Sequence, residues 1–153
     1  MLINNPRTVV AGLSGGSGKT LVSAGVTAAL RARGFSIQTF KKGPDFIDAA
    51  WLARASGRPC YNLDTYMMGE YRVVRSFAIR AAAAQASVIE GNRGIFDGVD
   101  AEGSHSTARL AQTLRAPIVL TVDCTKSTRT IAALILGCVN FEDVMGGKGP
   151  GIA

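Results

Sequence analysis

A glycine-rich loop set between a short apolar stretch and a helical pattern constrains the fold of this chain more than any other feature. Residues 8–11 read TVVA, which is typical of a short buried strand, and residues 19–33 carry apolar residues at helical spacing before Gly34. The loop from Gly12 to Thr20 (GLSGGSGKT) joins the two segments. A strand, a tight glycine loop and a helix in this order predict a βαβ unit with a right-handed crossover, and therefore a parallel sheet.

The rest of the chain repeats this alternation of strands and helices. The apolar patterns predict further strands at 36–40, 87–90 and 117–122, and helices at 49–56, 70–84, 107–114 and 128–137. We therefore predict an α/β fold with three layers, similar to the P-loop NTPases, in which a mostly parallel sheet has helices on both faces. In such folds ligands bind at the carboxyl ends of the strands.

The length of 153 residues suits one domain with a single core. We assign residues 1–144 to this domain and residues 145–153 to a glycine-rich tail without periodicity. No strand is legible after the last predicted helix, so the domain is expected to be incomplete or truncated.

Composition narrows the class of ligand. Lys and Arg number 17 against 11 for Asp and Glu, and the formal charge of +6 favours anionic ligands. The basic residues are scattered and aromatics are few, which argues against nucleic acid as a partner. Three cysteines without a CxxC pair and a single histidine exclude a zinc constellation and suit a reducing, cytoplasmic setting. No leader segment or apolar run of membrane-spanning length is visible, so we expect no membrane association.

The glycine loop itself predicts a phosphate site. Glycines let the backbone curl with its N–H groups inward, and the N-terminus of the following helix adds the positive end of its dipole. Lys19 can reach the β- and γ-phosphates, and the Thr20 hydroxyl can coordinate Mg²⁺. We predict that ATP and Mg²⁺ bind here, through Gly12, Ser14, Gly15, Gly16, Ser17, Gly18, Lys19 and Thr20. The strand before, the helix after and the terminal GKT argue against an ordinary glycine turn.

The spacing of the loop departs from the common GxxxxGK[ST] pattern. Leu13 stands where that pattern places its first glycine, and Gly12 precedes it by one residue. This longer loop resembles that of the dethiobiotin synthetase and partitioning-ATPase branch of P-loop proteins. The partitioning ATPases carry a second lysine before the glycine pair, where this chain has Ser14. The resemblance therefore favours the synthetase side.

Acidic residues follow the second predicted strand, in Lys41-Lys42-Gly43-Pro44-Asp45-Phe46-Ile47-Asp48. Asp45 and Asp48 are three apart and share one face if a helix begins there. Two carboxylates near a triphosphate repel it, and a Mg²⁺ ion bound between them would offset this repulsion. For Asp48 the alternative is a helix N-cap. Lys41 either contacts a phosphate or a substrate carboxylate, or is an ordinary solvated lysine.

A second acidic loop, residues 90–98 (EGNRGIFDG), follows the third predicted strand. Glu90, at the end of an apolar strand, is placed as a further metal-binding acid, with a solvated strand-end charge as the alternative. Glycines around Asp97 suggest a loop that closely approaches a ligand, with a turn residue as the alternative. For Asp123 and His105 we favour capping or surface roles.

These motifs together resemble the N-terminal synthetase domain of the cobyrinic acid a,c-diamide synthase family. The matching segments are residues 11–20, 40–48, 55–60 (ASGRPC), 62–64 (NLD), 90–91, 96–98, 106–108 and 122–123. The resemblance covers roughly residues 8 to 140 and is specific, because KxGPD[FY]xD with NLD is not a generic P-loop pattern.

The resemblance implies an ATP-dependent amidoligase that phosphorylates carboxylates of a corrin-type tetrapyrrole, the cobyrinic acid a and c side chains, for amidation in cobalamin biosynthesis. It implies that Lys19 stabilises the transferring phosphoryl group and that Thr20, Asp45 and Glu90 hold Mg²⁺. Asp48 and Asp97 would orient the substrate or help handle ammonia. Lys41 is also expected to be a catalytic residue.

Members of this family usually continue into a glutaminase domain, which nothing in this sequence resembles. The ammonia is therefore expected to come from solution or from a separate or missing glutaminase domain. Related synthetases dimerise, so a homodimer is possible. The alternatives are a dethiobiotin-synthetase-like carboxylase acting on a diamine, a partitioning-type ATPase acting as a binding module, and a truncated chain that folds without activity. The GPD and NLD motifs count against the carboxylase, and Ser14 counts against the partitioning ATPase.

Overall fold

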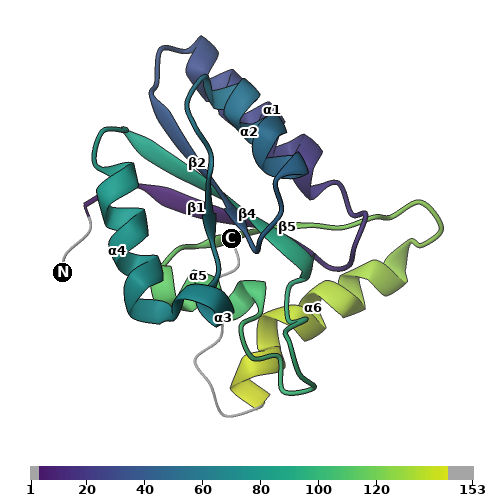
Figure 1. Cartoon of the computed structure of the whole chain (residues 1–153). Coiled ribbons are helices and arrows are strands. Elements are labelled where there is room, and N and C mark those ends of the chain that lie inside the picture. The colour runs from purple at the N-terminus through teal and green to yellow at the C-terminus, as the bar shows by residue number, and fades with distance from the viewer. Residues whose placement is uncertain (1–3, 145–153) are drawn as a thin grey trace.

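The computed structural model describes residues 4–144, with the backbone alone for 142–144. A five-stranded sheet in the order β3-β2-β4-β1-β5 forms its centre (Figure 1). The strands are β1 (Arg7–Gly12), β2 (Ile37–Lys42), β3 (Tyr61–Leu63), β4 (Ala86–Gly94) and β5 (Ile118–Thr121). Every pairing between them is parallel, which confirms the predicted sheet type.

Helices cover both faces of this sheet, as the alternation of patterns predicts. They are α1 (Lys19–Ala32), α2 (Ile47–Ser56), α3 (Thr65–Met68), α4 (Glu70–Ala81), α5 (Thr107–Leu114) and α6 (Arg129–Val144). The helices α1 and α2 pack side by side on one face, and α4 and α5 cover the other (Figure 1). Within residues 4–144, no helix is long and apolar enough to cross a bilayer.

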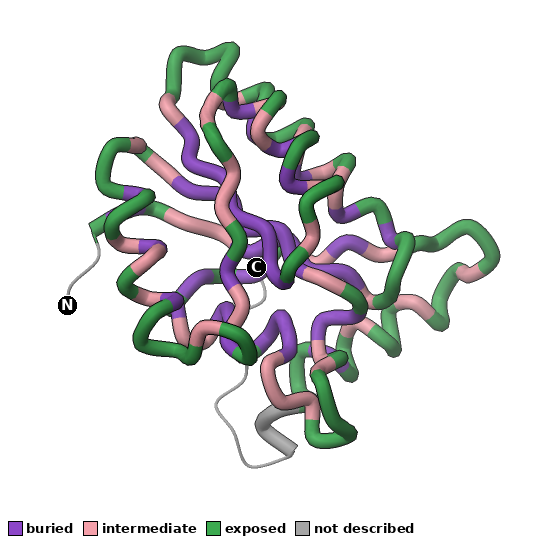
Figure 2. Tube along the Cα trace, viewed as in Figure 1, coloured by how far each residue is buried: buried purple, intermediate pink, exposed green. Residues whose placement is uncertain are grey.

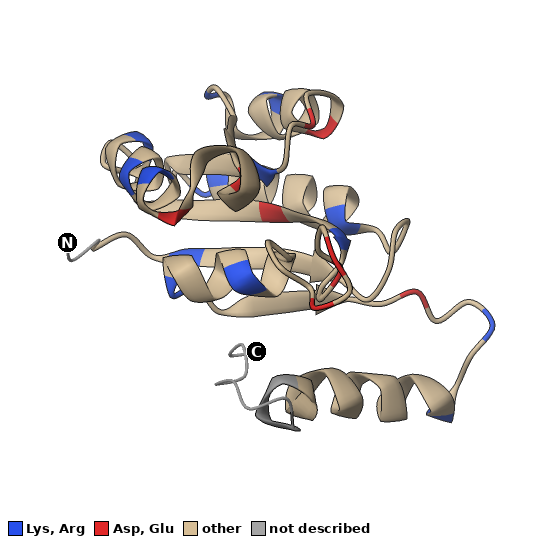
Figure 3. Cartoon of the chain, turned by 60° about the horizontal axis from the view of Figure 1, so that its bottom comes forward, with Lys and Arg blue, Asp and Glu red and all other residues tan. Residues whose placement is uncertain are grey.

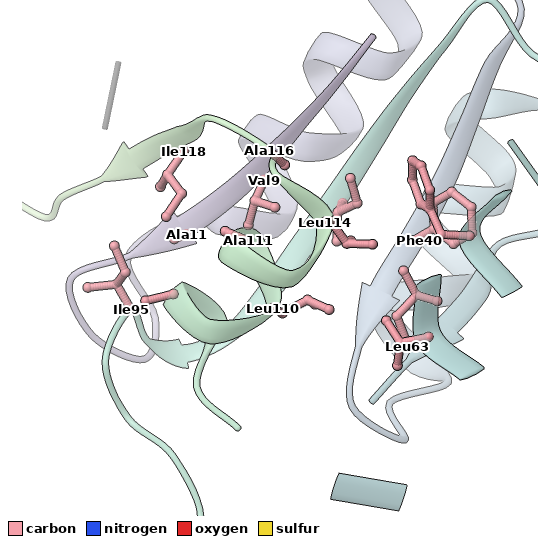
Figure 4. Packing of buried hydrophobic residues seen from close by; sticks show 14 of the residues in the cluster. Val9, Ala11, Phe40, Leu63, Ile95, Leu110, Ala111, Leu114, Ala116 and Ile118 are labelled. Atoms are coloured by element: carbon pink, nitrogen blue, oxygen red, sulfur yellow. The ribbon is translucent and has the colours of Figure 1, made fainter. Parts of the chain in front are cut away.

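The core divides into two parts because successive strand residues point to opposite faces. Val10 and Val88 pack with Leu30 of α1 on one face. Their neighbours Val9 and Ile89 join the larger cluster on the other face, which includes residues of α4 and α5. In Figure 4 the labelled side chains of α5 lie against those of β1 and β5. Figure 2 shows the strands buried along most of their length, with the outer sides of the helices exposed.

Several predicted boundaries are wrong. The strand expected to end at residue 40 runs on to Lys42, and the strand expected to end at residue 90 continues to Gly94. The helix expected to reach residue 84 ends at Ala81, whereas the last helix extends past residue 137 to Val144. The sequence pattern did not predict the extensions of β2 and β4 because these strand ends contain charged residues and glycines, which are not typical of strands.

The sequence patterns also missed β3 and α3, which have three and four residues. Elements this short show no periodicity. The helix α6 lies apart from most of the fold (Figure 3). It contacts the fold through Cys138, which belongs to the larger core cluster, and through Phe141, whose ring centroid is 4.9 Å from that of Phe96. The predicted tail, residues 145–153, lies outside the described residues.

Candidate functional site

The glycine loop curls tightly between β1 and α1. Gly16 and Gly18 have positive φ angles of 74° and 83°, which L-residues with side chains rarely adopt. Gly12 is crowded: an added Cβ atom would overlap Ser17 Oγ and lie 2.8 Å from the carbonyl oxygen of Ser14. The loop is therefore a concave turn whose shape depends on glycine at these positions.

Lys19 extends back over this loop. Its Nζ donates a hydrogen bond of 3.0 Å to the carbonyl oxygen of Ser14, and the residue is buried. Burial, with the nearby charge of Lys41, lowers the pKa of Lys19 although nearby acids partly offset this. Within the described residues Lys19 forms no ion pair, so its charge is left for an anionic ligand.

A buried carboxylate lies beside the start of α1. Glu90 is fully buried in β4, and its Oε1 accepts hydrogen bonds from Thr20 Oγ1 at 2.7 Å and from Lys41 Nζ at 2.9 Å. Glu90 is thus neither at a strand end nor in contact with water. The three residues come from α1, β2 and β4, and only the parallel sheet brings them together.

Lys41 is an internal ion-pair partner rather than a solvated lysine. Its residue is 1% exposed, and its Nζ also donates to Asp48 Oδ2 at 2.8 Å and to the carbonyl oxygen of Gly91 at 3.0 Å. Burial by itself would lower the pKa of Lys41, but the hydrogen bonds and negative charges of Asp48 and Glu90 raise it above its ordinary value. Lys41 therefore stays protonated and holds two acids in place.

Asp45 and Asp48 take different positions at the start of α2. Asp45 Oδ1 accepts the backbone N–H of Asp48 at 3.0 Å, and its Oδ2 lies 3.9 Å from Lys41 Nζ. The side chain of Asp48 does not cap the helix but pairs with Lys41. Burial alone would raise the pKa of Asp48, but the hydrogen bond and charge of Lys41 lower it. The capping contact of this turn therefore belongs to Asp45.

One oxygen of the Glu90 carboxylate fits a site for a magnesium ion. Glu90 Oε2 is buried and has no hydrogen-bond partner among the residues that the structure describes. A buried carboxylate oxygen without a partner is costly, and a hard cation with oxygen ligands relieves that cost. Within the described residues, no group of three or more His, Cys, Asp and Glu side chains is placed to hold a metal alone. Mg²⁺ in nucleotide sites takes few protein ligands and completes its shell with phosphate and water, so the two findings agree.

Two cavities open at the carboxyl ends of the strands. The first has a volume of about 390 Å³ and is lined by most of the predicted site residues, namely Gly15, Gly16, Ser17, Gly18, Lys19, Thr20, Lys41, Asp48 and Glu90. Gly12 and Ser14 are not among its lining residues, although the carbonyl of Ser14 holds Lys19. Asp45 is also not among them.

The second cavity, of about 540 Å³, contains Asp97 and lies next to the first, since Asn92 and Arg93 line both. Asp97 Oδ2 accepts the backbone N–H of Gly94 at 2.9 Å, so Asp97 shapes its turn while also lining a cavity. His105 lines the same cavity, and its Nδ1 lies 2.9 Å from Thr65 Oγ1. Asp123 is exposed and accepts the backbone N–H of Thr125, which is the turn-capping role favoured from the sequence.

Sequence reasoning gave no role to Asn62 and Asn92, whose hydrogen bonds hold the loops near these cavities. Asn62 donates to the carbonyl oxygens of Gly43 at 2.6 Å and of Asp45 at 2.9 Å, and so fastens the acidic loop to β3. Asn92 is fastened by Thr107, whose hydroxyl donates to the Asn92 carbonyl and accepts its backbone N–H. The NLD motif at 62–64 and the matching segment 106–108 contain Asn62 and Thr107, but a motif does not tell which backbone groups its side chains reach.

The chain is similar to several curated proteins along most of its length. It is 48% identical over 136 residues to the cobyrinate a,c-diamide synthase of Magnetococcus marinus, which covers 89% of this chain and 29% of that protein. It is 49% identical over 138 residues to the cobyrinate a,c-diamide synthase of Syntrophotalea carbinolica, covering 90% and 30%. To the hydrogenobyrinate a,c-diamide synthase of Streptomyces coelicolor it is 45% identical over 138 residues, covering 90% and 28%. The chain thus spans about 30% of the length of these relatives.

A family comparison agrees with the phosphate loop and the parallel sheet. Residues 8–146 match the family described as the CobQ/CobB/MinD/ParA nucleotide binding domain. Since this match takes in the loop, both acidic segments and nearly the whole sheet, the chain belongs to the CobQ/CobB/MinD/ParA nucleotide binding domain family.

Proposed function

We propose that this chain is the ATP-dependent synthetase domain of an amidoligase that amidates the a and c carboxylates of cobyrinic acid or a closely related corrin. The names of the similar proteins support this substrate class. The observation that carries the proposal is the buried Glu90 carboxylate beside the phosphate loop, which shares one oxygen between Thr20 and Lys41 and leaves the other without a partner.

The proposed reaction has two steps. An oxygen of the substrate carboxylate attacks the γ-phosphorus of ATP, the bond from that phosphorus to the bridging oxygen breaks, and ADP leaves. The nitrogen of ammonia then attacks the acyl carbon, the bond from that carbon to the phosphate oxygen breaks, and one ammonia proton ends on the departing phosphate. Positioning and charge neutralisation dominate phosphoryl transfer, which suits a site built from fixed charges.

The residues of the first cavity take the charge-neutralising roles. Lys19, which has no acidic partner among the described residues, would balance the charge on the transferring phosphoryl group. Thr20 and Glu90 of this cavity, with Asp45 from outside its lining, would hold Mg²⁺, which supplies further neutralisation of phosphate charge when it is bound. Lys41 keeps Glu90 in a fixed position through its 2.9 Å hydrogen bond.

One further acid in each cavity takes a role on the substrate side. Asp48 lines the first cavity and Asp97 the second, and the two cavities share Asn92 and Arg93. We propose that they orient the substrate and help accept the proton of attacking ammonia. Lys41 fixes the position of the Asp48 carboxylate through their 2.8 Å hydrogen bond, which supports the orienting role.

Phosphate release tests this function. The purified chain is incubated with ATP, Mg²⁺, ammonium and cobyrinic acid, and the phosphate released is measured with and without the corrinoid. We expect corrinoid-dependent release, formation of the amide, and loss of both in Lys19→Ala. The matched control is Lys126→Ala, which removes an exposed lysine outside both cavities. A folded chain that binds ATP but releases no phosphate with the corrinoid would contradict the proposal that this chain by itself activates the corrinoid carboxylates.

Two further assay conditions test the source of ammonia and the alternative carboxylase function. Glutamine in place of ammonium should give no reaction, because nothing in the chain resembles the family's glutaminase domain. A diamine with bicarbonate in place of the corrinoid tests the dethiobiotin-synthetase-like carboxylase. Phosphate release with the diamine and none with cobyrinic acid would replace the proposed function by that one.

A further inference from the structure

The second cavity contains a buried cation that nothing in the described structure neutralises by direct contact. Lys42, the last residue of β2, is 9% exposed and lines this cavity. Lys41, its neighbour in sequence, forms all of the ion pairs recorded among the described residues, and Lys42 forms none. A buried lysine without an acidic partner is costly, so the cavity is suited to a ligand that brings negative charge.

The carboxylate near Lys42 is already engaged elsewhere. Asp64 lines the same cavity, but its Oδ1 accepts the backbone N–H groups of Tyr66 and Met67 at 2.8 and 3.0 Å and caps α3. Burial lowers the pKa of Lys42, and although Asp64 offsets part of this, the charge of Arg93 lowers the pKa further. Asp64 therefore stabilises the lysine at a distance without forming an ion pair with it.

Arg93 adds a second cation where the two cavities meet. It lines both, and its backbone has a positive φ of 51°, a conformation that costs about 1 kcal/mol for a residue with a side chain. Its backbone N–H donates to Asn92 Oδ1 at 3.0 Å, which helps to hold this conformation. Two cations that line the same cavity repel one another, and an anion bound between them offsets this repulsion.

We propose that Lys42 and Arg93 bind a carboxylate of the substrate that is not being phosphorylated, and so set which carboxylate reaches the phosphate loop. The inference rests on the proposed function and deepens it: the substrate must carry at least two carboxylates, one for each cavity. Lys42 is the specificity residue of this pair because it lines only the second cavity. A carboxylate held by lysine and arginine gains charge-assisted hydrogen bonds, which are stronger than neutral ones.

The test compares the binding of cobyrinic acid to the wild-type chain, Lys42→Met and Lys42→Arg, by titration calorimetry in the presence of Mg²⁺ and a non-hydrolysable ATP analogue. Lys42→Met should weaken corrinoid binding about ten-fold or more, as expected for a lost hydrogen bond between charged groups. Lys42→Arg should restore most of the affinity. The affinity for the ATP analogue should be unchanged in both variants, which also shows that they are folded.

Fully esterified cobyrinic acid identifies the group that is recognised. It should bind weakly and equally to the wild-type chain and to Lys42→Met, since it offers no carboxylate. Lys126→Met, which removes a distant exposed lysine, should leave the affinity for cobyrinic acid unchanged. In steady-state assays Lys42→Met should raise KM for the corrinoid much more than it lowers kcat.

The outcomes separate this inference from the proposed function. If Lys42→Met binds cobyrinic acid as tightly as the wild-type chain does, the inference is overturned while the proposed function stands. An equal loss of affinity for the esterified corrinoid would also overturn it, because the lysine would then recognise something other than a carboxylate. A wild-type chain that binds the ATP analogue but not cobyrinic acid would overturn the proposed substrate and, with it, this inference.

Discussion

Glu90 illustrates how a single residue of this chain ties fold to function. A buried carboxylate is tolerated only when its charge is compensated, and Lys41 and Thr20 compensate one of its two oxygens. Removing Lys41 would leave Glu90 buried and unpaired, which costs about 3–5 kcal/mol in comparable cases. The second oxygen has no hydrogen-bond partner among the described residues, so it is free to contact the Mg²⁺ ion of the proposed function.

Gly12 gives a sharp prediction at this scale. Gly12→Ala should weaken ATP binding about ten-fold or more, because overpacking at a crowded position typically costs about 1–3 kcal/mol. The added Cβ would overlap Ser17 Oγ and lie 2.8 Å from Lys19 Nζ, so the loop must shift. Affinity is measured by titration with a fluorescent ATP analogue.

Gly25→Ala is the matched control, since an added Cβ there meets nothing within 4 Å and the residue lies inside α1. It should leave ATP affinity unchanged and raise thermal stability slightly, because alanine favours a helix more than glycine does. Equal ATP affinity in Gly12→Ala and Gly25→Ala would show that the geometry of Gly12 does not shape the binding site.

The cysteines differ in predicted reactivity. Burial raises the pKa of the Cys60 thiol to about 11, whereas Cys124 is exposed. Relative to an ordinary thiol of pKa 9.0, Cys60 then has about a hundred-fold less thiolate near neutral pH, and the thiolate is the reactive form. Iodoacetamide at pH about 8 should therefore alkylate Cys124 well before Cys60, as measured by mass spectrometry of peptides over time. In denaturant the two rates should converge, and equal rates in the folded chain would contradict the burial of Cys60.

At the scale of elements, patterns predicted the longer helices but not which faces they bury. In α1 the apolar residues recur at helical spacing, yet Leu21 is 79% exposed while Ser23 and Thr27 are fully buried. Small polar residues let α1 approach α2 and the sheet closely, and a pattern of apolar residues does not register this. The phosphate loop was predictable because its residues, 12–20, are contiguous in the sequence. The hydrogen-bonded group of Lys41, Asp48 and Glu90, which we call the Lys41 network, was not predictable, since its members come from β2, α2 and β4 and meet only in the folded sheet.

The short strand β3 supports the acidic loop through one side chain, and this leads to a prediction. Asn62→Ala removes two donors, to the carbonyl oxygens of Gly43 and Asp45, and so releases the turn that carries Asp45. Each lost hydrogen bond is expected to cost about 0.5–1.5 kcal/mol of unfolding free energy. The variant should also need more Mg²⁺ to reach half-maximal ATP binding, because the loop is less firmly placed.

The effect is measured by urea unfolding and by ATP titration at several Mg²⁺ concentrations. Asn140→Ala is the matched control, since the Asn140 side chain makes one hydrogen bond within α6, to the carbonyl oxygen of Leu136. That variant should leave the Mg²⁺ requirement unchanged. The role assigned to β3 fails if Asn62→Ala and Asn140→Ala show the same Mg²⁺ dependence.

At the scale of the whole molecule, the site joins both halves of the sheet. The phosphate loop follows β1, the Lys41 network spans β2 and β4, and the hydroxyl of Ser17 lies 3.2 Å from that of Thr121 at the end of β5. A ligand in the first cavity therefore contacts segments that are far apart in the sequence. Ligand binding should consequently stabilise the fold as a unit rather than one loop alone.

Thermal unfolding tests this coupling. With ATP and Mg²⁺ at about a hundred times the dissociation constant, linkage adds about 2.7 kcal/mol to the free energy of unfolding, which raises Tm by about 5–10 °C for a chain of this size. Replacing Mg²⁺ by EDTA should remove a large part of this rise, because Glu90 then stays without a cation. Lys19→Ala should abolish the rise, while Lys126→Ala, which removes an exposed lysine, should keep it. An equal rise with and without Mg²⁺ would mean that the buried Glu90 carboxylate does not serve a metal, and Glu90→Gln, which keeps the shape but not the charge, should then bind ATP as the wild-type chain does.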